Sequence, residues 1–281
     1  MNIFVVPAVL FGLAIGSFIN VVVYRLPRNE SVIRPRSACP ECGCTIAWFD
    51  NIPILSWILL RARCRVCGAR ISFVYPVIEF TLALMFGLTA HLSARNLDWD
   101  TNAQAVASLL IVGAFAWLCA IGVALTAIDV RTNELPNKLV LSLYLVGIPL
   151  LTTSSLISQN NQQLVRAFFG LLILGLFYSS LSLFISLGMG MGDVKLSGIL
   201  GFYLAWLSWG SFIVGSLAAF GLGAGAGLTL IAVGKANRKS SIAFGPWMLL
   251  GAGVGALWGH ELWSSYISVI NSTLLSISSR G

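Results

Sequence analysis

Long apolar runs, separated by short polar segments, fill most of this chain of 281 residues. A helix of about 20 apolar residues crosses the hydrocarbon core of a bilayer, so each run of that length predicts a membrane-spanning helix. One stretch, between Lys195 and Lys235, has no charge inside it. It would be about 60 Å long as one helix and must fold back, and we expect the turn at 206–211, where glycine can turn the chain and tryptophans suit the interface. The other predicted spans are 3–24, 77–92, 104–128, 139–156, 164–187 and 242–263.

The composition agrees with a membrane protein. Hydrophobic residues make up 57% of the chain and charged residues 10%, against about 25% charged residues in soluble domains. The first run lacks a basic start and is followed by more spans, which indicates a retained helix and not a signal peptide. We therefore predict an all-α polytopic membrane protein with about eight transmembrane helices. Its expected parts are a first transmembrane helix (1–24), a cytoplasmic zinc-binding loop (25–76) and a seven-helix core (77–281). Close helix packing is expected at the glycine runs of two late spans, Gly221, Gly223, Gly225 and Gly227, and Gly251, Gly253 and Gly255.

The distribution of Lys and Arg predicts the orientation. If the N-terminus is outside, the inside loops are 25–76, 129–138, 188–195 and 235–241, and they hold all but three of the 17 basic residues. The exceptions are Arg95, Arg166 and Arg280. The positive-inside rule therefore places these loops in the cytoplasm. Topology and contact with anionic lipids account for the net charge of +7, so we expect no nucleic-acid partner.

Two Cys-x-x-Cys pairs lie in the first loop. Cys39 and Cys42 are separated from Cys64 and Cys67 by 21 residues, and glycine follows the second cysteine of each pair. This is the form of a zinc knuckle, and four thiolates make a closed, structural site with no open position for a water. Two disulfides are the alternative, but they are rare on the reducing side of the membrane. Cys44 is a spare thiol that could replace Cys42 as a ligand.

Between the two pairs, residues 48–60 form an apolar segment that is too short to span the membrane. Two interpretations stay open. The segment could be an amphipathic element on the bilayer surface, or it could pack against the zinc knuckles.

Asp129 and Asp193 are the strongest candidates for chemistry. Each lies at the end of an apolar run, and the chain has only ten acidic residues. A carboxylate near hydrocarbon is costly, and its usual reason is function. Two such carboxylates on one side of the membrane could share a proton, one acting as base toward water and the other as acid toward a carbonyl. The alternatives are simple pairing with Arg131 or Lys195, or an ion-coupled transporter, although transport sites lie nearer the midplane.

Other polar and small residues near these positions are weaker candidates. Gly188, Gly190 and Gly192 alternate before Asp193, which permits positive φ and close approach of an extended substrate. No strand precedes them, which argues against a nucleotide loop. Lys195 could act on the aspartate, hold substrate or anchor the chain at the membrane surface. Glu79 could pair with a loop arginine or contact substrate.

Several short segments stand in a characteristic order along the chain: 16–27, the two Cys-x-x-Cys pairs with 50–53 between them, 75–79, the Asp129 segment, the Gly-x-Gly-Asp-x-Lys segment and 244–246. With these segments in this order, the chain resembles the bacterial type IV prepilin peptidases, and the resemblance runs nearly end to end. It departs from the family at Asn137, where Pro-Asp is common and this chain has Pro-Asn.

The resemblance implies a membrane aspartic endopeptidase of the bacterial inner membrane. Its substrates would be type IV prepilins or type II secretion pseudopilins, cut at the cytoplasmic face after Gly and before a residue that is usually Phe. Many members also methylate the new N-terminus with S-adenosylmethionine, a reaction in which Glu79 could take part. No Gly-rich turn after a strand marks a site for that methyl donor. A transporter and a non-enzymatic zinc-ribbon adaptor are the alternatives. The implied site residues are the catalytic Asp129 and Asp193, the zinc ligands Cys39, Cys42, Cys64 and Cys67, and, as support for substrate or the aspartates, Gly190, Gly192, Lys195 and Glu79.

Overall fold

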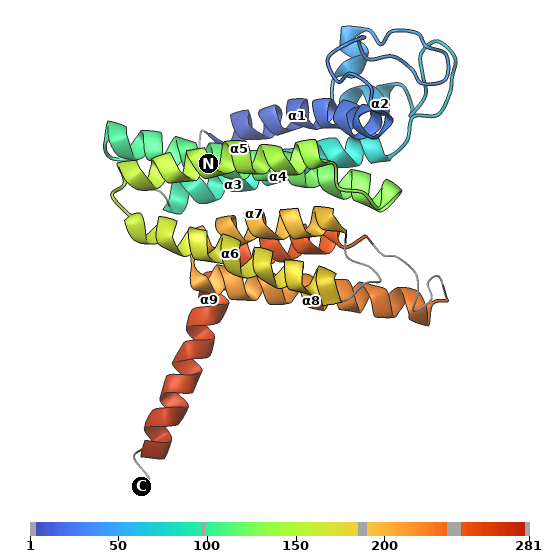
Figure 1. The fold of residues 1–281 in the computed structure, drawn as a ribbon. Helices are drawn as coiled ribbons and strands as arrows, with labels where there is room; N and C mark the ends of the chain where they lie inside the picture. Colours follow the sequence, from blue (N-terminus) through green and yellow to red (C-terminus); the bar gives the residue numbers. More distant parts are fainter. Residues whose placement is uncertain (1–3, 97–98, 185–189, 235–242, 279–281) are drawn as a thin grey trace. The chain divides into compact units, whose positions relative to one another are not determined.

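A computed structural model describes residues 4–96, 99–184, 190–234 and 243–278, and in these ranges the fold is helical (Figure 1). Within them the only β pairing consists of two isolated bridges, Ala38 with Thr45 and Arg63 with Arg70. The predicted all-α class is confirmed. The long helices are α1 (Val5–Arg25), α3 (Val74–Asn96), α4 (Asn102–Thr132), α5 (Asn137–Ile157), α6 (Asn161–Phe184), α7 (Met191–Leu207), α8 (Trp209–Ala232) and α9 (Gly245–Ser278), with short helices η1 (Leu26–Arg28), η2 (Trp48–Asn51) and α2 (Leu55–Leu59) in the first loop.

In the described residues each predicted span overlaps one of the long helices, and residues 3, 185–187 and 242, at the ends of three predicted spans, lie outside that part of the chain. Six of these helices are long and apolar enough to cross a membrane: α1, α3, α4, α5, α6 and α8. Helix α7 has 17 residues, which is short for a span, and α9 carries His260 and Glu261 among its apolar residues. The predicted turn after α7 is confirmed at Ser208, whose hydroxyl accepts the amide of Ser211 at 2.9 Å and so caps α8. Helix α9 continues 15 residues beyond the predicted end at Trp263. The predicted loop 235–241 lies outside the described residues.

The chain divides into two compact units. The first comprises Met1–Ile128 and Leu141–Ser158, and so contains the first loop, α1, α3 and most of α4 and α5. Helices α1 and α3 pack closely because α1 carries glycine at the contact: a Cβ on Gly16 would lie 2.6 Å from the Cα of Glu79. Near the end of α1 the buried Asn20 side chain donates to the Tyr75 carbonyl at 3.1 Å, which joins the two helices again.

The second unit comprises Asp129–Val140 and Gln159–Gly281, and two helix pairs build its core. Helix α6 meets α7 where Gly170 faces Gly201, with backbone against backbone. Helix α8 meets α9 in the same manner (Figure 1). Arg166 on α6 donates to the carbonyls of Ala205, Trp206 and Leu207 at 2.6, 2.7 and 3.0 Å, and so satisfies the end of α7.

The structure confirms only part of the predicted glycine packing. Gly251 and Gly255 on α9 contact the backbone of α8, and Gly223 on α8 lies against the ring of Phe244. The prediction is wrong for three others, because a Cβ on any of them would meet nothing within 4 Å: Gly221, Gly225 and Gly253. Alternate glycines lie about 200° apart on a helix, so adjacent members of such a run cannot share one contact face.

The α8–α9 contact gives a matched test. Replacing Gly255 with alanine is expected to lower the Tm by several degrees, because its Cβ would lie 2.6 Å from the Cα of Gly215 and overpacking costs about 1–3 kcal/mol. Gly253→Ala is the control on the same helix and should leave the Tm unchanged or slightly higher, since alanine favours helix. Thermal unfolding of the purified protein in detergent measures both. Equal Tm values for the two variants would contradict this packing.

Candidate active site and cysteine cluster

Asp129 lies in the last turn of α4 and is only 4% exposed. The helix ends just beyond it, where Asn133 adopts a left-handed conformation with φ of 52°. The Asn133 amide donates to the Asp129 carbonyl at 2.8 Å, an arrangement that asparagine tolerates at a helix C-terminus. The carboxylate is therefore held on regular helix, immediately before a turn.

Asp193 lies in the first turn of α7 and is 8% exposed. Gly190 is the extended residue before the helix, and its carbonyl accepts the Asp193 amide at 3.0 Å. A negative charge in the first turn interacts favourably with the helix dipole. The second carboxylate is thus also placed by a helix end.

Gly245 and Leu135 connect the segments that carry the two aspartates, all within the second unit. The amide of Gly245 donates to Asp129 Oδ2 at 3.1 Å, and a Cβ on Gly245 would lie 2.7 Å from the same oxygen. Leu135 packs on Gly245 and also on Gly192, the neighbour of Asp193. Asp129 and Asp193 also lie close enough for their carboxylates to interact electrostatically. The structure therefore brings the two predicted catalytic residues into one cluster.

Aromatic side chains border the cluster. Tyr178 of α6, Phe220 of α8 and Phe244 have ring centroids 5.5, 5.7 and 6.2 Å apart, and Tyr178 is 1% exposed. The charge of Asp193 acts on Tyr178. Two carboxylates beside an apolar wall have little water to separate their charges, which favours one shared proton and hence an acid and a base in one site. Nothing in the sequence distinguished Tyr178, Phe220 or Leu135 from ordinary apolar core residues.

The predicted supporting residues near Asp193 have mixed outcomes. The positive φ that these glycines permit is not used by Gly190, whose φ is −71°, or by Gly192. Close approach is found at Gly192, where a Cβ would lie 2.8 Å from the Cβ of Leu135. Gly188 lies outside the described residues. Lys195 Nζ donates to Asn137 Oδ1 at 2.8 Å, which links α7 to the start of α5 at the residue where the chain departs from the family.

Glu79 belongs to the first unit. It is 7% exposed, and its carboxylate accepts the Ile54 amide at 2.7 Å and the Asn20 side chain at 3.4 Å. Of the two alternatives for Glu79, pairing with a loop arginine is not found among the described residues, where the loop contributes a backbone amide instead. Ile54 has a φ of 60°, which is strained for a β-branched residue. Glu79 thus fixes an unfavourable turn of the loop against α1 and α3.

Cys39, Cys42, Cys64 and Cys67 form one cluster, with all four sulfur atoms within 4.8 Å of one another. Each pair lies on a turn of the same form. Gly43 and Gly68 have φ of 70° and 71°, and their amides donate to the carbonyls of Cys39 and Cys64 at 2.9 Å. Cys44 is exposed and corresponds to Ala69 of the other turn, so the structure places Cys42, and not Cys44, in the cluster.

The donor set fits a tetrahedral metal ion. Metal–sulfur bonds of about 2.3 Å put tetrahedral sulfurs roughly 3.8 Å apart, and Cys39 Sγ lies 3.9 Å from Cys67 Sγ. When bound, zinc would cross-link the two turns and hold the loop together.

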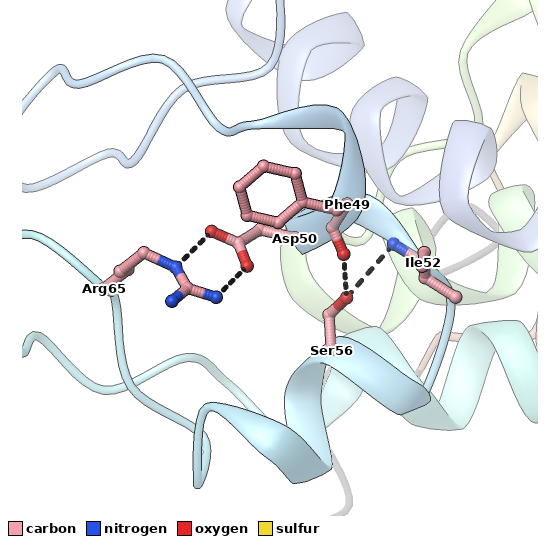
Figure 2. Close-up of polar contacts among 5 residues, drawn as sticks. All are labelled: Phe49, Asp50, Ile52, Ser56 and Arg65. Carbon is pink, nitrogen blue, oxygen red and sulfur yellow. Dashed lines mark hydrogen bonds and ion pairs between the residues drawn. The ribbon is translucent and has the colours of Figure 1, made fainter.

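Arg65 attaches the second cysteine turn to residues 48–56. Its guanidinium donates to both oxygens of Asp50 at 2.7 and 2.6 Å and holds the pKa of that carboxyl below its usual value (Figure 2). Ser56 closes the segment by donating to the Phe49 carbonyl at 3.0 Å and accepting the Ile52 amide at 3.1 Å. Residues 48–56 therefore contact the cysteine turns, as one of the two open interpretations requires.

The fold and these two groups of residues define a helical, multi-pass membrane protein with a buried carboxylate pair and a four-thiolate cluster. Two family models match the chain: the bacterial peptidase A24 N-terminal domain over residues 10–92 and the type IV leader peptidase family over residues 114–277. The chain belongs to the type IV leader peptidase family. The resemblance to the prepilin peptidases is thereby confirmed.

Curated relatives agree along nearly the whole chain. A prepilin leader peptidase/N-methyltransferase of Aeromonas hydrophila is 34% identical over 92% of this chain and 92% of its own length. Proteins of the same name from Pseudomonas aeruginosa and Myxococcus xanthus are 31% and 35% identical, over 94% and 85% of this chain and 93% and 67% of their own lengths. No solved structure matches.

The cysteine cluster predicts a selective loss of metal. The purified protein should contain about one zinc ion per chain, and Cys42→Ser should lose most of it because three thiolates leave the tetrahedron open. Cys44→Ser removes a neighbouring thiol outside the cluster and should retain the metal. Elemental analysis of protein prepared under reducing conditions measures this. Equal loss in both variants, or metal-free protein with two disulfides by thiol titration, would contradict the prediction.

Proposed function

We propose that this protein is an aspartic endopeptidase that removes the leader of type IV prepilins or pseudopilins, with Asp129 and Asp193 as its catalytic pair. The observation that carries the proposal is their burial in one cluster, tied through Gly245 and Leu135. The names of the relatives support the substrate class. The cut falls after Gly and before a residue that is usually Phe.

In this mechanism a water molecule lies between the two carboxylates. The ionised carboxylate takes a proton from the water as the water oxygen attacks the scissile carbonyl carbon. At the same time the protonated partner donates its proton to the carbonyl oxygen. The first aspartate then gives its proton to the departing amine as the C–N bond breaks, while the second takes a proton back from a hydroxyl of the tetrahedral intermediate as the carbonyl re-forms, so that the pair ends with one proton as it began. The Gly245 amide keeps Asp129 oriented throughout, since it bonds Oδ2 and leaves the other oxygen for chemistry.

The site would act at the cytoplasmic face of the bacterial inner membrane. The excess of basic residues in the loops at 25–76 and 129–138 supports this orientation. Both aspartates lie at helix ends, near the level at which a membrane-spanning substrate leaves the bilayer. The apolar helix of a pilin precursor could then pack beside the enzyme while its leader reaches the carboxylates.

We also propose that the protein methylates the new N-terminus with S-adenosylmethionine, as the names of the relatives suggest. The cysteine cluster would hold zinc as a structural element, because four thiolates leave no position for a reacting group. Glu79, which fixes the loop against α1 and α3, would support the shape of this unit.

Replacing either catalytic aspartate should abolish cleavage. Asp129→Asn and Asp193→Asn keep the side-chain size but remove the shared proton, and a reduction in rate of about 10²–10⁴ or more is expected. The cleavage rate is measured on a gel, as the conversion of a candidate prepilin to its shorter form by the enzyme in membranes or detergent.

Glu134→Gln is the matched control for that experiment. Glu134 is an exposed acid five residues after Asp129, and its neutralisation should leave processing intact. Cleavage retained in either aspartate variant would refute the catalytic pair. Substrate flux into vesicles without leader removal would instead identify a transporter.

Methyl transfer should be separable from cleavage. With radiolabelled S-adenosylmethionine, the wild-type protein should label the N-terminus of the cleaved pilin, whereas Asp193→Asn should label none of the uncleaved precursor. The same variant should label a pilin supplied with its leader already removed, because the carboxylates are assigned to hydrolysis alone. Cleavage without any label in the wild-type protein would refute the methyltransferase activity.

A further inference from the structure

The first unit contains a cavity that the proposed chemistry does not use. Its volume is about 790 Å³, and it lies between the end of α1 and the loop segments 32–37 and 45–51. Phe18 and Val21 of α1 form one wall, and Ile33 and Trp48 of the loop form another. Arg25, Arg36 and three neutral polar residues also line it, so the lining combines apolar, polar and basic groups.

Arg25 gives this cavity a fixed wall. It is buried, and its guanidinium donates to the carbonyls of Ser31, Pro35 and Arg36 at 3.0, 2.8 and 3.2 Å. These bonds hold segment 31–36 against the end of α1. Arg36 is exposed and is one of the residues that line the cavity, so its guanidinium is within reach of a ligand bound there.

The apolar part of the cavity lies at the depth of the bilayer's acyl chains, and its basic part lies at the depth of the headgroups. Helix α1 is one of the spans, and Arg25 lies at its end. Phe18 lies seven residues earlier, about 10 Å deeper along the helix. Phe18 and Phe11, one heptad apart on the same side of α1, are 50% and 60% exposed, so an apolar strip leads from the hydrocarbon to the cavity.

Trp48 and Ile33 are each 82% exposed at the loop side. Tryptophan is enriched at the membrane interface because its ring is apolar and its N–H is polar, and an apolar isoleucine beside it gains from contact with lipid. The surrounding loop is strongly basic: residues 25–76 carry eight arginines and three acidic residues, one of which, Asp50, is paired with Arg65.

We propose that this cavity binds one anionic phospholipid, with its phosphate beside Arg36 and an acyl chain along Phe18. An arginine fork suits a phosphate, and a basic segment next to a span attracts anionic lipid. The basic leader of a prepilin, the other candidate occupant, would meet like charge here. The inference concerns a binding site and does not depend on the peptidase activity.

Binding of phosphatidylglycerol to the purified full-length protein, followed by native mass spectrometry in detergent, tests the proposal. We expect one saturable lipid per chain, bound more tightly than phosphatidylcholine with the same acyl chains. Arg36→Gln should weaken binding of phosphatidylglycerol about fivefold. It leaves the backbone carbonyl that Arg25 bonds, so the cavity wall should persist, and an unchanged zinc content and Tm would verify folding.

Arg70→Gln is the matched control. It removes the same charge from an exposed arginine of the loop that does not line the cavity, and should change affinity less than twofold. Equal weakening by both variants would overturn the site in favour of diffuse surface attraction. Competition by glycerol phosphate alone would overturn the acyl part, and a basic leader peptide that displaces the lipid would assign the cavity to substrate.

A second measurement locates the lipid. Phosphatidylglycerol with brominated acyl chains should quench part of the tryptophan fluorescence, and that part should disappear in Trp48→Phe. Quenching unchanged by this substitution would place the lipid elsewhere and overturn the assignment.

Discussion

The hydrogen bond from the Gly245 amide to the buried carboxylate of Asp129 is the contact on which the arrangement of the two-aspartate cluster depends. A buried carboxylate needs a donor, because without one the cost of removing it from water is not recovered. Only glycine can bring its amide this close, since a Cβ would lie 2.7 Å from the oxygen. Once Gly245 is placed, Leu135 fills the space between it and Gly192, which sets the start of α7 and with it Asp193. One polar contact and one leucine therefore fix three segments that are far apart in sequence.

The first loop is stabilised in a different way. Its large apolar residues include Trp48 and Leu59, which are 82% and 71% exposed, so the loop does not close on a hydrophobic core of its own. Its order comes from the two cysteine turns, the Asp50–Arg65 pair and the bond from Ile54 to Glu79. Such a loop gains most from a metal, because coordination constrains the chain where apolar burial does not. The strained turn at Ile54 is held by a polar contact as well. Glu79 is buried against α1, and its carboxylate accepts the Ile54 amide.

Much of this architecture could be predicted from the sequence because apolar length and cysteine spacing are local signals. They gave the helices, the turn at Ser208 and the four-cysteine cluster, and the scarcity of acids singled out Asp129 and Asp193. Contacts between distant segments could not be predicted in this way. Leu135 and Tyr178 are ordinary apolar positions until the fold brings them to the carboxylates, and Glu79 has an amide partner that no charge pattern reveals. The predicted packing of the glycine runs was partly wrong for a related reason. A glycine permits close helix contact, but the direction in which it faces around the helix decides whether contact occurs.

The arginines of the loop show that charges counted together for topology perform separate tasks. Arg25 is buried and bonds three carbonyls, so its charge organises backbone. Arg65 is paired with Asp50 and adds little net field. Arg36 is exposed and lines the cavity at the end of a membrane span. Because the first two are committed to protein groups, the attraction for an anionic ligand falls to the arginines that remain, and among these Arg36 is the one that the cavity places beside a path for an acyl chain.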